Sequence, residues 1–236
     1  MKRQSDVNEL LAESLDLLEQ IKNSYVQAET NEEIVLITRP KVKSCLEHLR
    51  SSLDYIAKDL SEKTNSKKSP RNVYFPYGKN QKIFNKSVNK NLPDLDEAYR
   101  KVIESIQPHK SDENWLLHLC KTTNFNKHTE LQEQERENSP SSTTKIGNLI
   151  SMDSTSSVTI GKLVVNGKEV NPDGPLELTG KKPLAEIRKE IVQEIPIERK
   201  YEWVRFLLKG TQIDILSLLD KAQNEIQQMS DQIYSV

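Results

Sequence analysis

The sequence predicts an α+β protein that is mainly α-helical, with a small antiparallel β insertion before the last helix. Apolar residues recur every three or four positions through most of the first 136 residues, as in amphipathic helices. Short alternating segments separated by turn residues follow over 137–209, and a final amphipathic stretch covers 210–236. We therefore expect a helical bundle over 1–136, a β-rich insertion over 137–209, and a C-terminal helix over 210–236 that packs back on the bundle.

The helices can be placed from their apolar stripes and their end signals. The predicted helices cover about 6–28, 40–60, 94–106 and 111–135. TNEE (30–33) has the spacing of a capping box, so we expect a second helical region to open there, kinked or restarted at Pro40. Ser111 is the expected cap of the helix that continues to about Glu135. Residues 61–72 read as a loop, and 73–78 read as an extended segment.

The β-rich insertion is predicted from short runs with β-branched residues. Asn166 and Gly167 lie between two such runs, which is a strong signal for a two-residue hairpin. EIRKEIVQEI (186–195) predicts a short helix, and KYEWVRFLL (200–208) predicts a further strand. Gly210 ends that strand, and the C-terminal helix follows.

Composition limits the classes of function. With a formal net charge of −1, the chain cannot attract nucleic acid over its whole surface, so any such site must be local. We find no signal peptide and no apolar run near the roughly 20 residues that span a bilayer. We therefore expect a cytoplasmic protein that does not associate with membranes. Cys45 and Cys120 lie among leucines in helical patterns, which predicts buried thiols rather than a disulfide scaffold.

The stretch TTNFNKHTEL (122–131) carries the residues best suited to chemistry. On a helix Cys120, Asn124 and His128 share one stripe, so we expect Asn124 and His128 to face inward or into a groove, with Lys127 at its edge. A histidine there could act as a general acid or base, and Lys127 could pair with an anion. The same spacing also fits a hydrogen-bond network that joins helices around a buried His and Asn.

Arg50 is the candidate phosphate ligand outside this stretch. It precedes Asp54 by four residues, which fits an intrahelical salt bridge. The functional interpretation is that Arg50 reaches the helix of Asn124 and His128 and completes a catalytic set.

A basic segment between Lys63 and Asn91 is the best local indication of a nucleic-acid partner. It holds lysines and one arginine with interleaved aromatic residues and no acidic residue, a pattern that suits single-stranded RNA. The expected RNA-binding residues are Lys67, Lys68, Arg71, Lys79, Lys82 and Tyr77. Alternatively, Phe75 and Phe84 fill the bundle and the lysines belong to a solvated loop.

Other chemistries have no support in the sequence. His118 and His128 do not have a metal-ligand spacing, and no Asp, Glu or Cys completes one. There is no glycine-rich phosphate loop and no G-x-S-x-G motif. We therefore expect neither a metal nor another cofactor.

Several motifs, in their order along the chain, resemble those of a group of uncharacterised bacterial and phage helical proteins. They are CLEHLRSSLDYIAKDL, YFPYG, IQPH and LHLCKTTNFNKHTEL. More distantly, the chain resembles the HEPN superfamily of helical RNases and toxin components. That resemblance implies a HEPN-like bundle from a prokaryotic defence, toxin or mobile-element system, metal-independent RNA cleavage, and a homodimer or other protein partner.

Carried onto this chain, the HEPN motif places its polar residue at Asn124 and its histidine at His128. The arginine position falls on Thr123, so Lys121, Lys127 or Arg50 would have to hold the phosphate instead. Two hypotheses follow. The protein engages RNA, with RNase chemistry centred on His128, Asn124, Lys127 and Arg50, or it is a non-catalytic interaction module in which Asn124 and His128 are structural.

Overall fold

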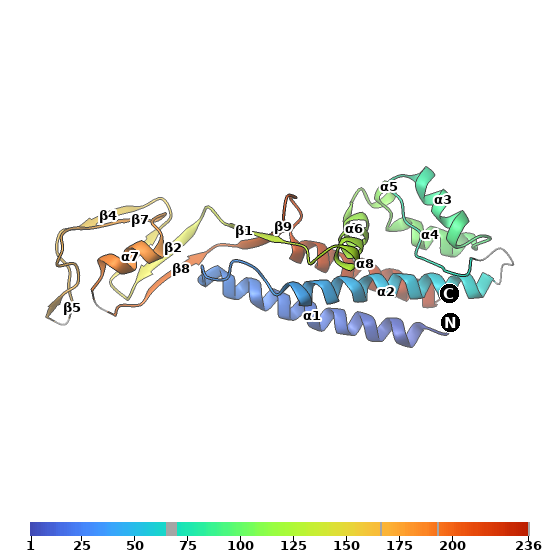
Figure 1. The fold of residues 1–236 in the computed structure, drawn as a ribbon, viewed down its shortest axis with the longest axis horizontal. Coiled ribbons are helices and arrows are strands. Elements are labelled where there is room, and N and C mark those ends of the chain that lie inside the picture. The colour runs from blue at the N-terminus through green and yellow to red at the C-terminus, as the bar shows by residue number, and fades with distance from the viewer. Residues whose placement is uncertain (65–69, 166, 193, 236) are drawn as a thin grey trace. The chain divides into compact units, whose positions relative to one another are not determined.

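The computed structural model describes residues 1–64, 70–165, 167–192 and 194–235 and shows an α+β fold (Figure 1). The described residues form two compact units. Unit 1 comprises 1–23, 36–135 and 206–236, and unit 2 comprises 24–35 and 136–205. No helix within these described ranges is long and apolar enough to cross a bilayer.

Unit 1 is built on long helices with buried apolar stripes. They are α1 (Gln4–Thr30, of which residues 24–30 belong to unit 2), α2 (Arg39–Thr64), α6 (Trp115–His128) and α8 (Ile215–Ser235). Helix α2 packs against α6 and α8, and α6 also packs against α8. Leu49, Leu53 and Ile56 of α2 are fully buried at this junction of helices, because positions three and four apart fall on one helical face.

Shorter helices complete unit 1. They are α3 (Gln81–Asn91), α4 (Glu97–Ser105) and α5 (Pro108–Ser111). Helix α3 was not predicted from the sequence. The Asn80 side chain accepts a hydrogen bond from the Ile83 amide at its start, and Phe84 and Val88 are buried on its inner face.

Two predicted helix starts are wrong, the capping box at 30–33 and the cap at Ser111. The capping box at 30–33 does not form, because the Thr30 hydroxyl donates to the Gln27 carbonyl inside α1. Helix α2 begins at Arg39 with Pro40 in its first turn, which confirms the restart at Pro40 that the sequence predicted as one alternative. Ser111 lies in α5, where its hydroxyl donates to the Gln107 carbonyl, so it does not cap α6.

Helix α6 ends at His128 rather than near Glu135. The Asn126 side chain accepts a hydrogen bond from the Gln132 amide and turns the chain. β1 (Gln134–Asn138) then pairs with β9 (Val204–Leu208). The strand predicted over 200–208 is therefore split between β8 (Ile197–Tyr201) and β9.

Unit 2 contains small antiparallel sheets. β2 (Ser142–Ile146) lies between β3 (Ile150–Asp153) and β8, while β4 (Ser157–Ile160) pairs with β7 (Leu176–Thr179). β5 (Val164–Val165) pairs with β6 (Lys168–Glu169). Val165 faces Lys168 in this pair, which confirms the two-residue hairpin, although Asn166 lies outside the described residues.

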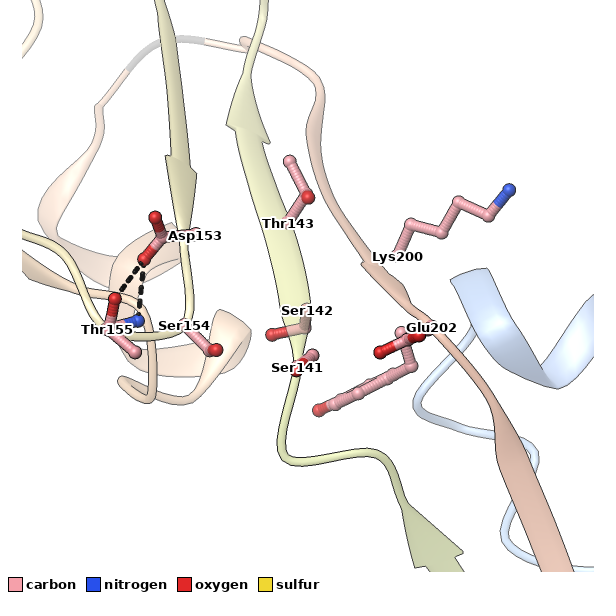
Figure 2. Close-up of a pocket in the computed structure, with 9 residues that line it drawn as sticks. Ser141, Ser142, Thr143, Asp153, Ser154, Thr155, Lys200 and Glu202 are labelled. Atoms are coloured by element: carbon pink, nitrogen blue, oxygen red, sulfur yellow. Dashed lines mark hydrogen bonds between the residues drawn. The ribbon is translucent and has the colours of Figure 1, made fainter.

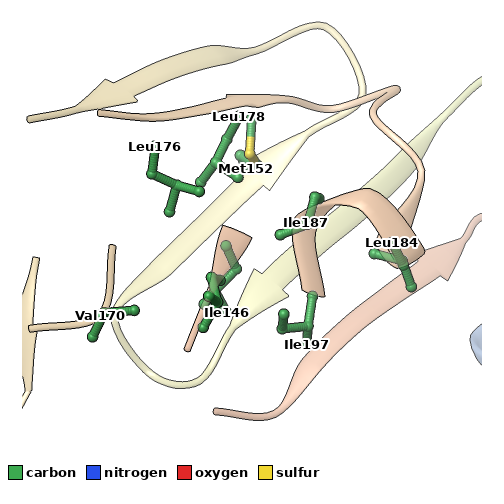
Figure 3. Close-up of a cluster of buried hydrophobic side chains, with 9 residues drawn as sticks. Ile146, Met152, Val170, Leu176, Leu178, Leu184, Ile187 and Ile197 are labelled. Atoms are coloured by element: carbon green, nitrogen blue, oxygen red, sulfur yellow. The ribbon is translucent and has the colours of Figure 1, made fainter. Parts of the chain in front are cut away.

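An apolar core holds these sheets and α7 (Leu184–Glu190) together, as Figure 3 shows. Its buried members are Ile146, Met152, Val170, Leu176, Leu178, Leu184, Ile187, Ile191 and Ile197. Residues 24–35 also belong to unit 2, which the sequence did not indicate. The Arg136 guanidinium donates to the Ala28, Asn31 and Ile34 carbonyls in that segment.

Candidate functional site

The candidate site lies on the outer side of α6. The buried face of this helix consists of Trp115, Leu116, Leu119, Cys120, Thr122, Thr123 and Asn126. Lys121, Asn124 and His128 fall on the other side and are exposed, and Lys127 is exposed in the last turn. The 14-residue helix contains no Asp or Glu, so its outer face carries positive charge only.

His128, Asn124 and Lys127 lie together in the last two turns of α6 and are exposed to solvent. The expectation that Asn124 and His128 face inward is wrong, because the helix turns Thr123 and Asn126 toward the core instead. Among the described residues, neither the His128 nor the Asn124 side chain has a hydrogen-bond partner. The alternative interpretation, a hydrogen-bond network that joins helices through Asn124 and His128, is therefore wrong for the residues that the structure describes.

Thr123 occupies the position that the HEPN resemblance assigns to arginine. Its side chain is buried, with 1% of its surface exposed, and its hydroxyl donates to the Leu119 carbonyl at 2.6 Å. A side chain that starts from this position points into the bundle. Of the cations that the sequence offered in place of this arginine, Lys121 and Lys127 are exposed on α6.

Arg50 reaches α6, but not at the predicted place. Its guanidinium donates to the Cys120 Sγ at 2.7 Å, pairs with the Asp54 carboxylate at 3.2 Å, and lies 5.3 Å from the centre of the Tyr77 ring. Asp54 also accepts a hydrogen bond from the Phe75 amide at 2.8 Å. Cys120 precedes His128 by eight residues, which is about 12 Å along a helix axis.

Arg50 thus joins α2, α6 and the extended segment over 73–78, and its donors are directed to Cys120 and Asp54. The side chain is 11% exposed. The structure does not bring Arg50 together with His128, and its geometry matches the salt-bridge interpretation of Arg50 and Asp54.

The predicted RNA-binding residues of the basic segment between Lys63 and Asn91 differ in their exposure. Lys67 and Lys68 lie outside the described residues, whereas Arg71, Lys79 and Lys82 are exposed. Tyr77 is half-buried under Arg50, and its burial raises the pKa of the phenol. Phe75 and Phe84 are buried in the bundle, as the alternative interpretation held. The segment therefore presents cations, but two of its four aromatic rings are buried, Tyr77 is half-buried, and Tyr74 alone of the four is exposed.

A pocket of about 530 Å3 adjoins the outer face of α6. It is lined by His118, Lys121, Thr122, Phe125, Gln132, Leu208, Thr211, Gln212 and Ile213. Partial burial, and secondarily the charge of Lys121, lowers the pKa of His118. The sequence did not reveal this pocket as a site, because its walls come from α6, from the turn after it, and from the turn that precedes α8.

Unit 2 has a pocket of its own, of about 420 Å3, between the ends of β2, β3 and β8 (Figure 2). Asp153 accepts hydrogen bonds from the Thr155 amide and from the hydroxyls of Thr155 and Ser156, and these bonds lower its pKa. The Tyr201 hydroxyl donates to Glu32. These polar groups serve the turns around the pocket, and its lining includes no histidine or cysteine.

In the described ranges, no group of three or more His, Cys, Asp or Glu side chains is arranged to hold a metal ion. No protein-family model, curated protein or solved structure matches the chain.

Proposed function

We propose that the protein engages RNA through the outer face of α6 and cleaves it without a metal ion, with His128 as the general acid and base. The observation that carries this proposal is the exposed His128 imidazole beside Lys127 and Asn124, with no hydrogen-bond partner for His128 among the described residues. A catalytic group must be open to its substrate, and His128 meets that condition.

Charge supports an RNA backbone as the ligand. Lys121 and Lys127 stand on a helix without acidic residues, in a chain whose net charge is −1. Exposed lysines of this kind are the side chains that commonly contact the phosphates of a nucleic-acid backbone. Glu133, which follows the helix, is paired with Lys209, so part of the nearby negative charge is offset.

The chemistry needs only the residues at the end of α6. An imidazole nitrogen of His128 takes the proton of a ribose 2′-hydroxyl, and the 2′-oxygen then attacks the neighbouring phosphorus. The bond from phosphorus to the 5′-oxygen breaks, and the imidazolium returns its proton to that oxygen. The Lys127 ammonium and the Asn124 amide offset the charge that develops on the phosphate oxygens.

His118 does not share this step. It precedes His128 by ten residues, which places the two about 15 Å apart along the helix axis. One phosphate therefore does not contact both histidines of α6. In a homodimer, which the HEPN resemblance implies, the second imidazole would come from the other copy's His128.

The test is cleavage of an end-labelled single-stranded RNA in the presence of EDTA. We expect products with a 2′,3′-cyclic phosphate and a 5′-hydroxyl. The rate of cleavage should fall by roughly 100-fold or more in His128→Ala. His48→Ala, a partly exposed histidine on α2, is the matched control and should cleave like wild type. RNA with a 2′-deoxy residue at the cleaved position should resist cleavage.

A non-catalytic interaction module is the second candidate function. One observation favours it: the Arg50 guanidinium, the predicted phosphate ligand, is engaged by Cys120 and Asp54, so it is not available to a phosphate beside His128. Binding of RNA without cleavage would remove the catalytic part of the proposal. Absence of RNA binding would remove all of it and favour this second function.

A further inference from the structure

We propose that the pocket beside α6 binds one unpaired nucleobase of the RNA. The inference rests on the proposed function and makes it narrower, because it names single-stranded RNA as the ligand. The pocket belongs entirely to unit 1 and is formed by α6, the turn that follows α6, and the turn between β9 and α8.

The pocket lies next to the proposed phosphate face. His118, Lys121, Phe125 and His128 are spaced by three, four and three residues along α6, so they form one stripe on the helix surface. Lys121 and Phe125 line the pocket, and His128 is one turn beyond Phe125. One turn is about 5.4 Å along the axis, so a base in the pocket leaves its own phosphate within the range of Lys121 or His128.

The lining matches the chemistry of a base. Phe125 is a half-buried aromatic ring that can stack on a planar ligand. The side-chain amides of Gln132 and Gln212 each offer a donor and an acceptor, as the edge of a base does. Neither amide has a partner among the described residues, so both are available to a ligand.

The walls are held in place from behind. The Gln132 backbone amide donates to the Asn126 side chain at 3.0 Å. On the facing wall, the Thr211 hydroxyl donates to the Leu208 carbonyl at 2.7 Å and accepts from the Ile213 amide at 3.1 Å. These bonds fix both turns before a ligand enters, which lowers the entropic cost of binding.

A neutral planar ring suits the pocket better than an anion does. Lys121 is its one permanent cation, and its apolar members are Phe125, Leu208 and Ile213. The lowered pKa of His118 favours the uncharged form of that imidazole. The volume of about 530 Å3 is within the range of about 300–1,000 Å3 for small-ligand pockets.

The experiment compares two fluorescent RNAs by anisotropy, a short single-stranded oligomer and the same oligomer with abasic sites. Wild type should bind the intact RNA about tenfold more tightly or better, since stacking stabilises each bound base. Phe125→Leu and Gln212→Ala should bind the intact RNA as weakly as wild type binds the abasic one. Gln81→Ala, an exposed glutamine on α3, is the matched control.

The outcomes separate this inference from the proposed function. If wild type binds neither RNA, the proposed function and the base pocket both fall. If it binds both RNAs equally, or if both pocket variants keep the preference for intact RNA, the base pocket falls while RNA binding stands. The thermal unfolding midpoint of each variant must match that of wild type within a few degrees. Gln212 is an exposed turn residue, so Gln212→Ala tests the pocket even if Phe125→Leu is unstable.

Discussion

Asp59 is a buried carboxylate that joins three helices of unit 1. Its side chain is 1% exposed and pairs with the Arg3 guanidinium at 3.0 Å. It also accepts hydrogen bonds from the Arg3 backbone amide and from the Tyr234 hydroxyl, both at 3.0 Å. A buried carboxylate is tolerated because all of these donors face it. The start of α1 and the end of α8 are thereby attached to α2.

The Tyr234 phenol should make stability sensitive to alkaline pH. Burial, followed by the nearby charge of Asp59, raises the pKa of Tyr234 above its ordinary value. The folded protein therefore keeps this proton at a pH where the unfolded chain, with a pKa near 10, loses it. The contribution is complete below about pH 10 and declines above it, by up to about 1.4 kcal/mol per pH unit.

Urea unfolding of wild type and Tyr234→Phe between pH 8 and 11 measures this effect. The free energy of unfolding should fall less steeply above pH 10 in the variant, because its side chain does not ionise. Other titrating groups are common to both proteins and cancel in the comparison. Parallel pH curves would show that Tyr234 does not contribute as expected.

The two cysteines should be unreactive in the folded protein. Burial raises the pKa of the Cys45 thiol to about 12. It is also the main reason why the pKa of the Cys120 thiol is raised to about 11. Thiolates are the reactive form, so at pH 8 a disulfide reagent should label neither residue within the time that labels both in guanidinium chloride. Rapid labelling of the native protein would contradict their burial.

Helix α3 depends on the single cap at Asn80. The Asn80 side chain satisfies the Ile83 amide, one of the amides that lack partners at a helix start. Asn80→Ala should lower the free energy of unfolding by about 1 kcal/mol, whereas Asn80→Asp should leave it nearly unchanged. Chemical denaturation measures both variants. Equal stability of all three proteins would show that the cap is dispensable.

The sequence predicted the mainly helical α+β fold and the two-residue hairpin, because periodicity and turn chemistry are local properties. It did not predict α3, although Asn80 followed by Phe84 and Val88 has the spacing of a capped, half-buried helix. The many lysines of that segment led to its interpretation as a basic loop, and its short apolar face was missed.

The end of α6 depends on contacts that are distant in sequence. The Lys209 amide donates a hydrogen bond to the Glu133 carbonyl. Because of this pairing, the chain after α6 forms β1 instead of the predicted continuation of the helix. Distant contacts also explain why the candidate site was predicted only in part. His128, Asn124 and Lys127 lie together as neighbours on one helix, but Arg50 is held by Asp54 and Cys120, and Gln212 joins the pocket from another segment.

At the scale of the whole molecule, each unit has a buried apolar core of its own. Leu53 is fully buried in unit 1, and Ile146 is fully buried in the apolar cluster of unit 2. Leu53→Ala and Ile146→Ala should each cost about 2–5 kcal/mol. Calorimetry should resolve two transitions, with each variant lowering a different one. A single transition that both variants shift equally would mean that the units unfold together.

The pairing of β1 with β9 has a consequence for how such a protein can change over evolution. The chain leaves for the insertion after β1 and returns at β9, and hydrogen bonds between Glu133 and Lys209 and between Ser139 and Trp203 flank the pair. The two ends of the inserted segment are therefore neighbours, and a short turn could replace everything between them. A gene for this protein could gain, lose or exchange the insertion as one cassette while the α6 face is left unaltered.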